Sequence, residues 1–246
     1  MPKKLKTFYI VLAATCLFLM ASYITWSALA SGPPLRTAES YVRALAGGDA
    51  GTALKLSTGT AAWAASRLKE SDVSVKIESV KCSVVASSRS WARVTVAVEL
   101  TLRDGSADVG WYSLDVTKTG QEWKVVSFHE AEPDLSGVSL LVKQADVEAA
   151  KQAFQQYLDA LTTGDMQSAA KHLAGPARKA QEMGAAVLGK GAVVGKVEGL
   201  KAEPAWERGK EMAVRFDYSI DGRSVSVLST FYRTTQGWKI VKVVQN

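Results

Sequence analysis

Cysteine and histidine are scarce in this chain of 246 residues, which contains two of each. Cys16 lies within a long apolar run near the N-terminus and Cys82 lies beyond it, so the two thiols would be on opposite sides of a membrane and could not pair. His129 and His172 are isolated, and with two separated cysteines they lack the number and spacing of ligands that a zinc site needs. We therefore predict a protein held by packing alone, without a metal or other cofactor.

A strong basic charge and recognisable catalytic motifs are also missing. The formal net charge is +6, of which Lys3, Lys4 and Lys6 supply half, and the remainder is too thinly spread for a nucleic-acid surface. No Gly-x-Ser-x-Gly elbow occurs. The segment from Gly184 to Gly191 resembles a phosphate-binding loop, but Gly191 stands where Ser or Thr would hold magnesium, so we interpret it as a helix-to-strand connection. These absences favour a protein that is not an enzyme and does not bind nucleic acid.

One long hydrophobic run is present, the 23 mostly apolar residues from Phe8 to Ala30. A helix of this length could cross the hydrocarbon layer of about 30 Å. Because the lysines precede it, residues 1–7 are predicted to be cytoplasmic and everything after residue 30 extracytoplasmic. Ala28-Leu29-Ala30 also has the form of a signal-peptide cleavage site, so removal of the run stays an alternative to an uncleaved signal anchor.

The rest of the chain contains an internal repeat. The segment Tyr41–Lys55 returns 116 positions later as Tyr157–Lys171, with seven identities in fifteen positions, where composition alone would give about one. Trp123–Val126 is matched in the same way by Trp238–Val241, at a spacing of 115. Two landmarks at nearly the same offset indicate a duplicated domain.

Each repeat is predicted to begin with helices. Apolar residues in the second repeat follow a helical stripe at Val147, Ala150, Phe154, Leu158 and Leu161. Gly48-Asp49 and Gly164-Asp165 then predict a helix end followed by an N-cap. Further helical segments are expected at about 50–69 and 166–188.

A four-stranded antiparallel sheet is predicted to follow in each repeat. One alternating set is apolar, and the other, which includes Glu99, is mostly polar, the period of a half-buried strand; the sets are Val94, Val96, Val98, Leu100 and Leu102, and Arg93, Thr95, Ala97, Glu99 and Thr101. Asp104-Gly105 and Asp221-Gly222 are typical of hairpin turns. The expected strands lie near 73–85, 94–102, 109–118 and 123–130, and near 193–202, 211–220, 223–234 and 238–245.

The fold class is therefore α+β, with an N-terminal transmembrane helix followed by two repeated domains. We expect a cytoplasmic N-terminus at 1–7, a signal-anchor helix at 8–30 and a spacer at 31–35. The first domain is expected at 36–130, a linker at 131–145 and the second domain at 146–246, each with helices packed on a curved sheet.

The Tyr-x-x-Ala-Leu-x-x-Gly-Asp motif of each helix pair and the final Trp-Lys-[Val/Ile]-Val strand resemble the nuclear-transport-factor-2-like superfamily. This resemblance covers nearly all of residues 36–246 and implies cone-shaped domains in which helices are wrapped by a curved sheet. A membrane helix followed by two such domains also resembles the conjugation and type IV secretion assembly proteins of Gram-positive bacteria. Some members of the superfamily are isomerases or cyclases that hold an acid–base group in the cone.

Large aromatic side chains are the best candidates for a ligand or partner surface, since such side chains are enriched at binding surfaces. The candidates are Trp63, Trp111, Tyr112, Trp206, Tyr218 and Tyr232. The interpretation favoured by the whole sequence is a membrane-anchored, extracytoplasmic scaffold of the bacterial cell envelope that binds a protein partner. A homo-oligomer stays open. The alternative is a small-molecule-binding or isomerase-like protein that uses the cone cavity.

Overall fold

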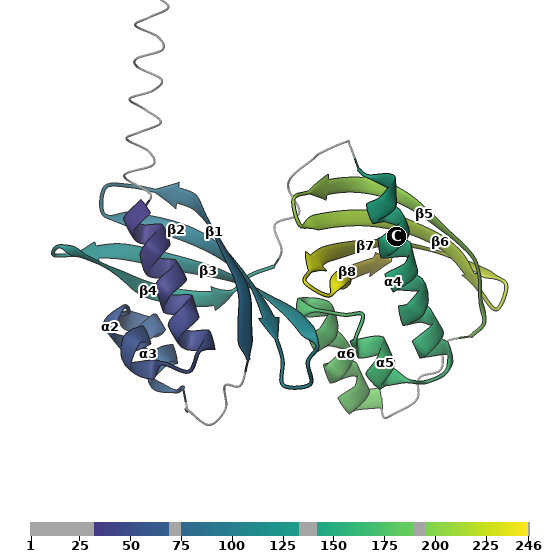
Figure 1. Cartoon of the computed structure of the whole chain (residues 1–246), viewed down its shortest axis with the longest axis horizontal. Helices are drawn as coiled ribbons and strands as arrows, with labels where there is room; N and C mark the ends of the chain where they lie inside the picture. Colours follow the sequence, from purple (N-terminus) through teal and green to yellow (C-terminus); the bar gives the residue numbers. More distant parts are fainter. Residues whose placement is uncertain (1–31, 69–74, 133–141, 189–194, 246) are drawn as a thin grey trace, which may run out of the picture. The chain divides into compact units, whose positions relative to one another are not determined.

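The structure is a computed structural model that describes residues 32–68, 75–132, 142–188 and 195–245. In both repeats, helices are followed by a meander of strands (Figure 1). In the first repeat residues 32–46 are helical, and the later elements are α2 (Ala50–Lys55), α3 (Gly59–Ser66), β1 (Lys76–Ser87), β2 (Trp91–Thr101), β3 (Ala107–Thr119) and β4 (Glu122–Glu130). In the second they are α4 (Gln144–Thr162), α5 (Met166–Ala170), α6 (Gly175–Leu188), β5 (Val197–Arg208), β6 (Glu211–Ile220), β7 (Arg223–Thr234) and β8 (Gly237–Gln245).

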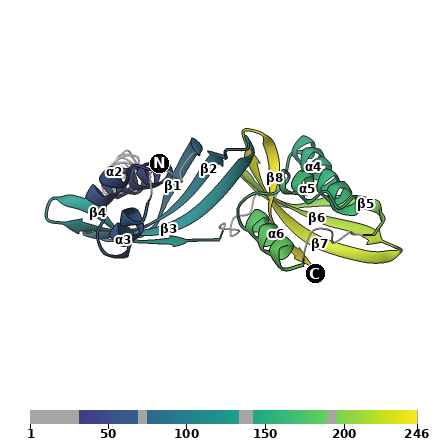
Figure 2. The same cartoon turned by 90° about the horizontal axis from the view of Figure 1, so that it is seen from below.

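The strands form two separate four-stranded sheets with the orders β1-β2-β3-β4 and β5-β6-β7-β8. Both are antiparallel meanders, and Figure 2 shows α4 lying along one face of the second sheet. The predicted α+β class with two repeated sets of helices and strands is thus confirmed. The segment expected to cross the membrane, Phe8–Ala30, lies outside the described residues. Within the described ranges, none of the helices combines the length and the apolar character that a membrane span requires.

The Gly-Asp pair of each repeat ends one helix and starts the next. Gly48 and Gly164 have positive φ angles of 74° and 72°, a conformation that glycine adopts without the steric cost of a Cβ. Asp49 accepts a hydrogen bond of 2.9 Å from the Thr52 N–H, and Asp165 accepts one of 2.9 Å from the Ser168 N–H. The predicted capping role of both aspartates is confirmed.

The Trp-Lys strand of each repeat is joined to the short helix after the Gly-Asp pair. Lys124 Nζ donates to the carbonyl of Lys55 at 2.6 Å, and Lys239 Nζ donates to the carbonyl of Lys171 at 2.7 Å. A parallel bridge accompanies each contact, Ser57 with Val125 and Leu173 with Ile240. Carbonyl groups at the C-terminus of a helix have no hydrogen-bond partner within the helix. In both repeats, the lysine of the Trp-Lys strand supplies that partner for the short helix that follows the Gly-Asp pair.

The second Asp-Gly pair, Asp221-Gly222, forms the turn between β6 and β7, as predicted. Asp221 and Gly222 have φ angles of 49° and 77°, and they connect the paired residues Ile220 and Arg223. A two-residue hairpin turn with both φ angles positive suits the right-handed twist of the strands, and Asp tolerates this conformation better than most residues.

The chain forms two compact units, and the strands β1, β2 and β3 of the first sheet are each divided between them. One unit contains the described residues up to 68 together with Cys82–Val96 and Ser113–His129. The other contains 75–81, Ala97–Tyr112 and the described residues from Glu130 onward. The second unit thus combines the second repeat with the distal ends of β1, β2 and β3.

Each unit has a buried aromatic centre. In the first unit, Tyr41 is fully buried, and its hydroxyl donates to the carbonyl of Ala61 at 2.7 Å. Its ring meets the ring of Phe128 edge-on, with centroids 5.9 Å apart. Burial raises the pKa of Tyr41 to about 12. The repeated tyrosine of the helix motif is therefore a core residue in the first unit.

Candidate functional site

The six aromatic candidates occupy different environments. Trp63 lies on α3 in the first unit and is 63% exposed, with the guanidinium of Arg67 over its ring at 4.6 Å. Trp206 is half-buried on β5, and Tyr218 is half-buried at the end of β6. The remaining candidates, Trp111, Tyr112 and Tyr232, lie in the second unit, where the first two belong to the distal end of β3.

The interior of the second repeat is filled by aromatic rings. Phe154 of α4 stacks on Phe216 of β6 with centroids 4.2 Å apart and ring planes 6° apart. Phe231 meets Phe216 edge-on at 5.9 Å, and Tyr218 meets Phe154 edge-on at 6.0 Å. All three phenylalanines are 1% exposed or less. The region between α4 and the sheet is thus a close-packed core.

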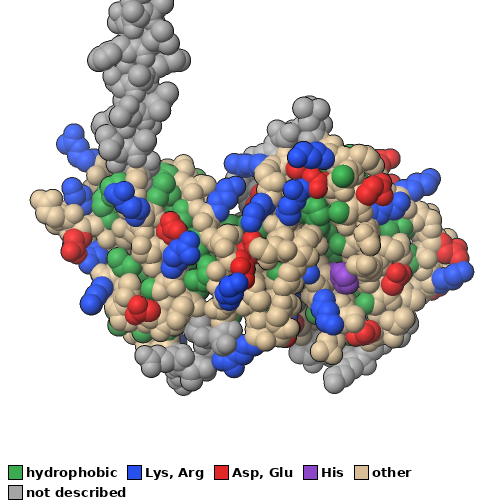
Figure 3. Space-filling view, viewed as in Figure 1, with side chains coloured by type: hydrophobic (Ala, Val, Ile, Leu, Met, Phe, Trp, Pro, Cys, Tyr) green, Lys and Arg blue, Asp and Glu red, His purple; other side chains and the backbone are tan. Residues whose placement is uncertain are grey.

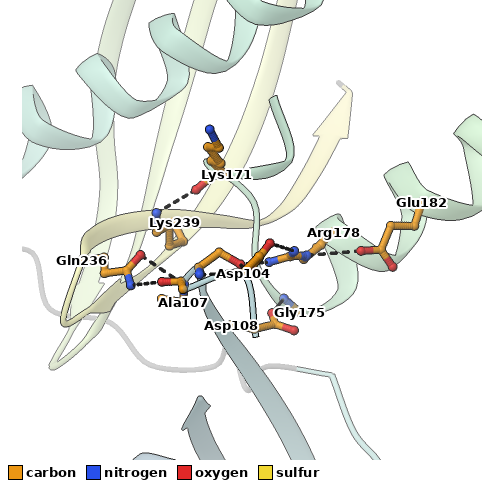
Figure 4. A network of polar contacts seen from close by, with 11 residues as sticks. Asp104, Ala107, Asp108, Lys171, Gly175, Arg178, Glu182, Gln236 and Lys239 are labelled. Carbon is orange, nitrogen blue, oxygen red and sulfur yellow. Dashed lines mark hydrogen bonds and ion pairs between the residues drawn. The ribbon is translucent and has the colours of Figure 1, made fainter. Parts of the chain in front are cut away.

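A polar network surrounds the turn between β2 and β3, within the second unit (Figure 4). Arg178 of α6 donates to Ser106 Oγ at 2.8 Å and to Asp104 Oδ2 at 3.4 Å. Gln236, in the turn before β8, accepts from the Ala107 N–H at 3.1 Å and donates to the carbonyl of Gly105 at 2.6 Å. The β2–β3 turn is therefore held both by α6 and by the β7–β8 turn.

Glu99 on β2 is a fully buried carboxylate, although it belongs to the mostly polar set of its alternating strand. It accepts hydrogen bonds from Lys210 Nζ at 2.8 Å, from the Thr235 N–H and from Ser79 Oγ at 3.1 Å. Burial acts to raise the pKa of Glu99, but the bonds from Lys210 and Thr235 outweigh it and the pKa lies below its ordinary value. Glu99 departs from the alternation of its half-buried strand because groups from distant parts of the chain, Lys210 and Thr235, cover this position.

A small apolar cluster lies beside this network. Trp111 meets Tyr232 of β7 edge-on, with ring centroids 5.6 Å apart, and Val109, Ala174 and Val241 complete the cluster. The start of α6 approaches it so closely that a Cβ on Gly175 would lie 2.7 Å from Trp111 Cζ3. The sequence-predicted candidates Trp111 and Tyr232 are thus brought together, as buried packing partners.

The same region contains a pocket of about 280 Å³. One wall is the β3 segment Asp108–Tyr112, and another is the first part of α6 with Gly175, Pro176 and Lys179. Glu130 and Glu132 also line it, with side chains that are 68% and 76% exposed. All of these residues belong to the second unit.

The two strand positions that shape the pocket wall are Gly110 and Tyr112. A Cβ on Gly110 would lie 2.6 Å from Tyr112 Oη, so the tyrosine ring occupies the space that a side chain at 110 would fill. Burial raises the pKa of Tyr112, while Lys179 acts to lower it and Glu130 and Asp108 act to raise it. The phenol therefore lies in the combined field of one ammonium and two carboxylates.

The charged groups of the pocket are ordered by specific partners. Asp108 Oδ1 accepts from the Gly175 N–H at 2.6 Å, which satisfies a free donor at the start of α6. Lys179 Nζ donates to Glu130 Oε1, and this hydrogen bond is the main reason that the pKa of Lys179 is raised. Lys242 of β8 pairs with Glu132 at 2.6 Å.

Sequence reasoning identified Trp111, Tyr112 and Tyr232 but missed Asp108, Glu130 and Lys179. These charged residues have no motif, and 67 positions separate Asp108 from the Gly175 N–H that it accepts. Among the described residues there is no group of three or more His, Cys, Asp and Glu side chains that could hold a metal. The described part of the phosphate-loop-like segment ends at Leu188, within α6.

Known proteins show only distant likeness to this chain. No family description matches it, and no curated protein matches it. One similar solved structure is an NTF2-like protein involved in plasmid conjugation, with 11% identity, coverage of 80% of this chain and 86% of that one, and a TM-score of 0.29. Another is a cystatin-like protein from Ruminococcus gnavus, with 12% identity, coverage of 84% and 77%, and a TM-score of 0.28. What the structure itself shows is two four-stranded antiparallel sheets, each accompanied by helices.

Proposed function

We propose that this protein is a non-enzymatic binding or scaffold protein of the bacterial cell envelope. In this proposal the apolar run Phe8–Ala30 anchors it in the membrane, both repeats lie outside the cytoplasm, and they bind a protein partner. A role in a conjugation or secretion assembly is the specific form that we favour, because a membrane segment followed by two repeats has the architecture of such assembly proteins. Tethering would raise the effective concentration of both repeats near a membrane-bound partner.

The observation that carries the proposal is the filled interior of the second repeat. An isomerase or cyclase of this fold would use an open space between helix and sheet, with an acid or base directed into it. Here Phe154, Phe216 and Phe231 occupy that space. A domain with a solid core offers its outer surface for binding, which is what a scaffold requires.

Exposed apolar side chains provide candidate contacts for a partner. Trp63 on α3, Met183 on α6 and Val243 on β8 are all exposed, although side chains of this kind favour burial. Charged side chains of both signs are interspersed on the face of the molecule that Figure 3 displays. A mixed surface of this kind favours a protein partner over a strongly charged polymer.

The test is site-specific photo-crosslinking of the full-length protein in its native membrane. A photoreactive phenylalanine analogue at Trp63, Met183 or Val243 should capture one and the same envelope protein. The same analogue at the exposed polar positions Lys118 and Arg223 should not capture it. Recovery of the protein in the soluble cytoplasmic fraction, or a small molecule retained on purification with no protein captured at any position, would refute the proposal.

A further inference from the structure

We propose that the pocket beside β3 and α6 binds an organic cation, an alkylammonium or guanidinium group presented from outside the protein. The lining combines aromatic rings with carboxylates, which is the combination that stabilises such a group through cation–π and charge-assisted contacts. This inference concerns the pocket alone and does not depend on the proposed role in the envelope.

The structure already places one ammonium group at this site. Lys179 Nζ is bonded to Glu130, and this bond is the main reason that the pKa of Lys179 is raised. Tyr112 and Asp108 line the same pocket as this ammonium group. The side chain of Lys179 is 55% exposed, so it can move into solvent and leave its place to another cation of the same kind.

Trp111 and Tyr112 are the aromatic residues of the pocket lining, at successive positions of β3 whose side chains point to opposite faces of the strand. Gly110 leaves room for the ring of Tyr112, and Trp111 is fixed between Gly175 and Tyr232. The indole N–H of Trp111 has no hydrogen-bond acceptor among the described residues, although the residue is only 7% exposed. Because Trp111 belongs to the pocket lining, its indole resonance serves as the reporter for a group that enters the pocket.

Charge balance favours a cation over an anion. Asp108, Glu130 and Glu132 contribute three negative charges to the lining, and Lys179 contributes the single positive one. When Lys179 moves away, the lining becomes more negative, and an external ammonium restores the balance. Lys242 of β8 pairs with Glu132 and offsets one of these negative charges, so three carboxylates face two ammonium groups at the site.

The experiment titrates the ¹⁵N-labelled full-length protein, in a non-ionic detergent, with n-butylammonium. We expect saturable shifts of the Trp111 indole and Gly110 amide resonances, and smaller shifts with the uncharged n-butanol or the anionic butyrate. The indole of Trp63, which is exposed on α3, serves as the internal control and should not shift saturably. Equal responses to butylammonium and butanol, or a preference for butyrate, would overturn the proposal.

Substitutions of Lys179 and Glu130 should change the affinity for butylammonium in opposite directions. Lys179→Ala removes the internal competitor and should tighten butylammonium binding about threefold, while Glu130→Gln should weaken it about threefold. These factors correspond to the modest energies of exposed ion pairs. Binding to the Lys179→Ala variant with none to the unaltered protein would count against the proposal, as would no gain in that variant.

A steric variant tests the pocket wall without altering charge. Gly110→Ala would place a Cβ against Tyr112 Oη and displace the ring, so butylammonium binding should fall at least threefold. Gly184→Ala on α6 is the matched control, because a Cβ there would have no neighbour within 4 Å. Similar affinities for both variants would show that Tyr112 takes no part.

Two sources could present such a cation, and a second titration separates them. Spermidine represents a free polyamine, and acetyl-Gly-Lys-Gly-amide represents the side chain of a protein partner. Binding of spermidine at least as tight as that of the peptide supports a free amine, and tighter binding of the peptide supports a partner side chain. Saturable binding of neither at the Trp111 resonance would refute the inference.

Discussion

Replacing Glu99 with glutamine should destabilise the protein far more than the same change at an exposed glutamate. Glu99 is 0% exposed and accepts from Lys210, from the Thr235 N–H and from Ser79. Glutamine keeps the shape of the side chain but removes the negative charge. It also places an amide NH₂ where at least one of the donors now finds an oxygen.

The size of the expected loss in stability follows from the kind of hydrogen bond that Glu99→Gln removes. A hydrogen bond to a charged group contributes roughly 1.5–3 kcal/mol, and a buried donor left without an acceptor adds a similar cost. Because Lys210 is 43% exposed, its ammonium can turn to water after the change, so we take the lower part of that range for its bond. We therefore expect Glu99→Gln to lower the free energy of unfolding by about 2–3 kcal/mol.

The pH dependence gives an independent check of the same contact. The pKa of Glu99 in the folded protein lies below its ordinary value of 4.5, so the contribution of the carboxylate is fully present above about pH 4.5. It is lost as the pH falls through the lower folded pKa. The difference in stability between the unaltered protein and Glu99→Gln should be constant near neutral pH and shrink in acid.

Urea unfolding followed by tryptophan fluorescence measures these differences. Glu122→Gln is the control, because Glu122 also pairs with a lysine, Lys124, but is 72% exposed, and pairs of this kind contribute at most about 1 kcal/mol. If Glu99→Gln costs no more than Glu122→Gln, or if its effect does not change with pH, then the buried contact does not stabilise the fold as reasoned.

Three further predictions concern packing and backbone. Phe154→Ala should cost about 3–5 kcal/mol in urea unfolding because it opens a cavity against Phe216, while Phe154→Leu should cost clearly less; equal losses would contradict the stacked core. Asp165→Ala should cost about 1 kcal/mol and Asp165→Asn only a few tenths, since Asn still caps the helix, and equal losses from the two would exclude capping. Gly175→Ala should cost more than about 1 kcal/mol, because φ is +55° and the new Cβ would meet Trp111, and a neutral effect on thermal unfolding would contradict that geometry.

The repeat, the helix caps and the hairpin turns could be predicted because each depends on neighbouring residues. Asp165 reaches an N–H only three positions away, and Asp221-Gly222 closes a turn between adjacent strands. Such short-range contacts leave a sequence pattern whatever the rest of the chain does. The helical segments predicted at 50–69 and 166–188 correspond to pairs of short helices for the same reason, since Gly59 and Gly175 interrupt them with positive φ angles.

Glu99 and the pocket could not be predicted, since their partners are far away in sequence. The strand alternation is correct for Val94, Val96 and Val98, which are buried, and fails at Glu99 one residue later. A lysine 111 positions further along the chain pairs with this carboxylate. Periodicity reports which face of a strand is apolar, but it cannot report what covers the opposite face.

By itself the sequence determined the duplication, the order of helices and strands, and the positions of the caps and turns, because these follow from local backbone preferences and side-chain periodicity. Only the tertiary structure decided that the ends of β1, β2 and β3 share a compact unit with the second repeat. It also decided that Glu99 is buried and that Asp108, Tyr112, Glu130 and Lys179 line one pocket. The physical reason is that burial and charge pairing depend on which residues lie close together in the folded chain. An isolated residue that belongs to no repeated pattern gives no indication in the sequence of which residues those are.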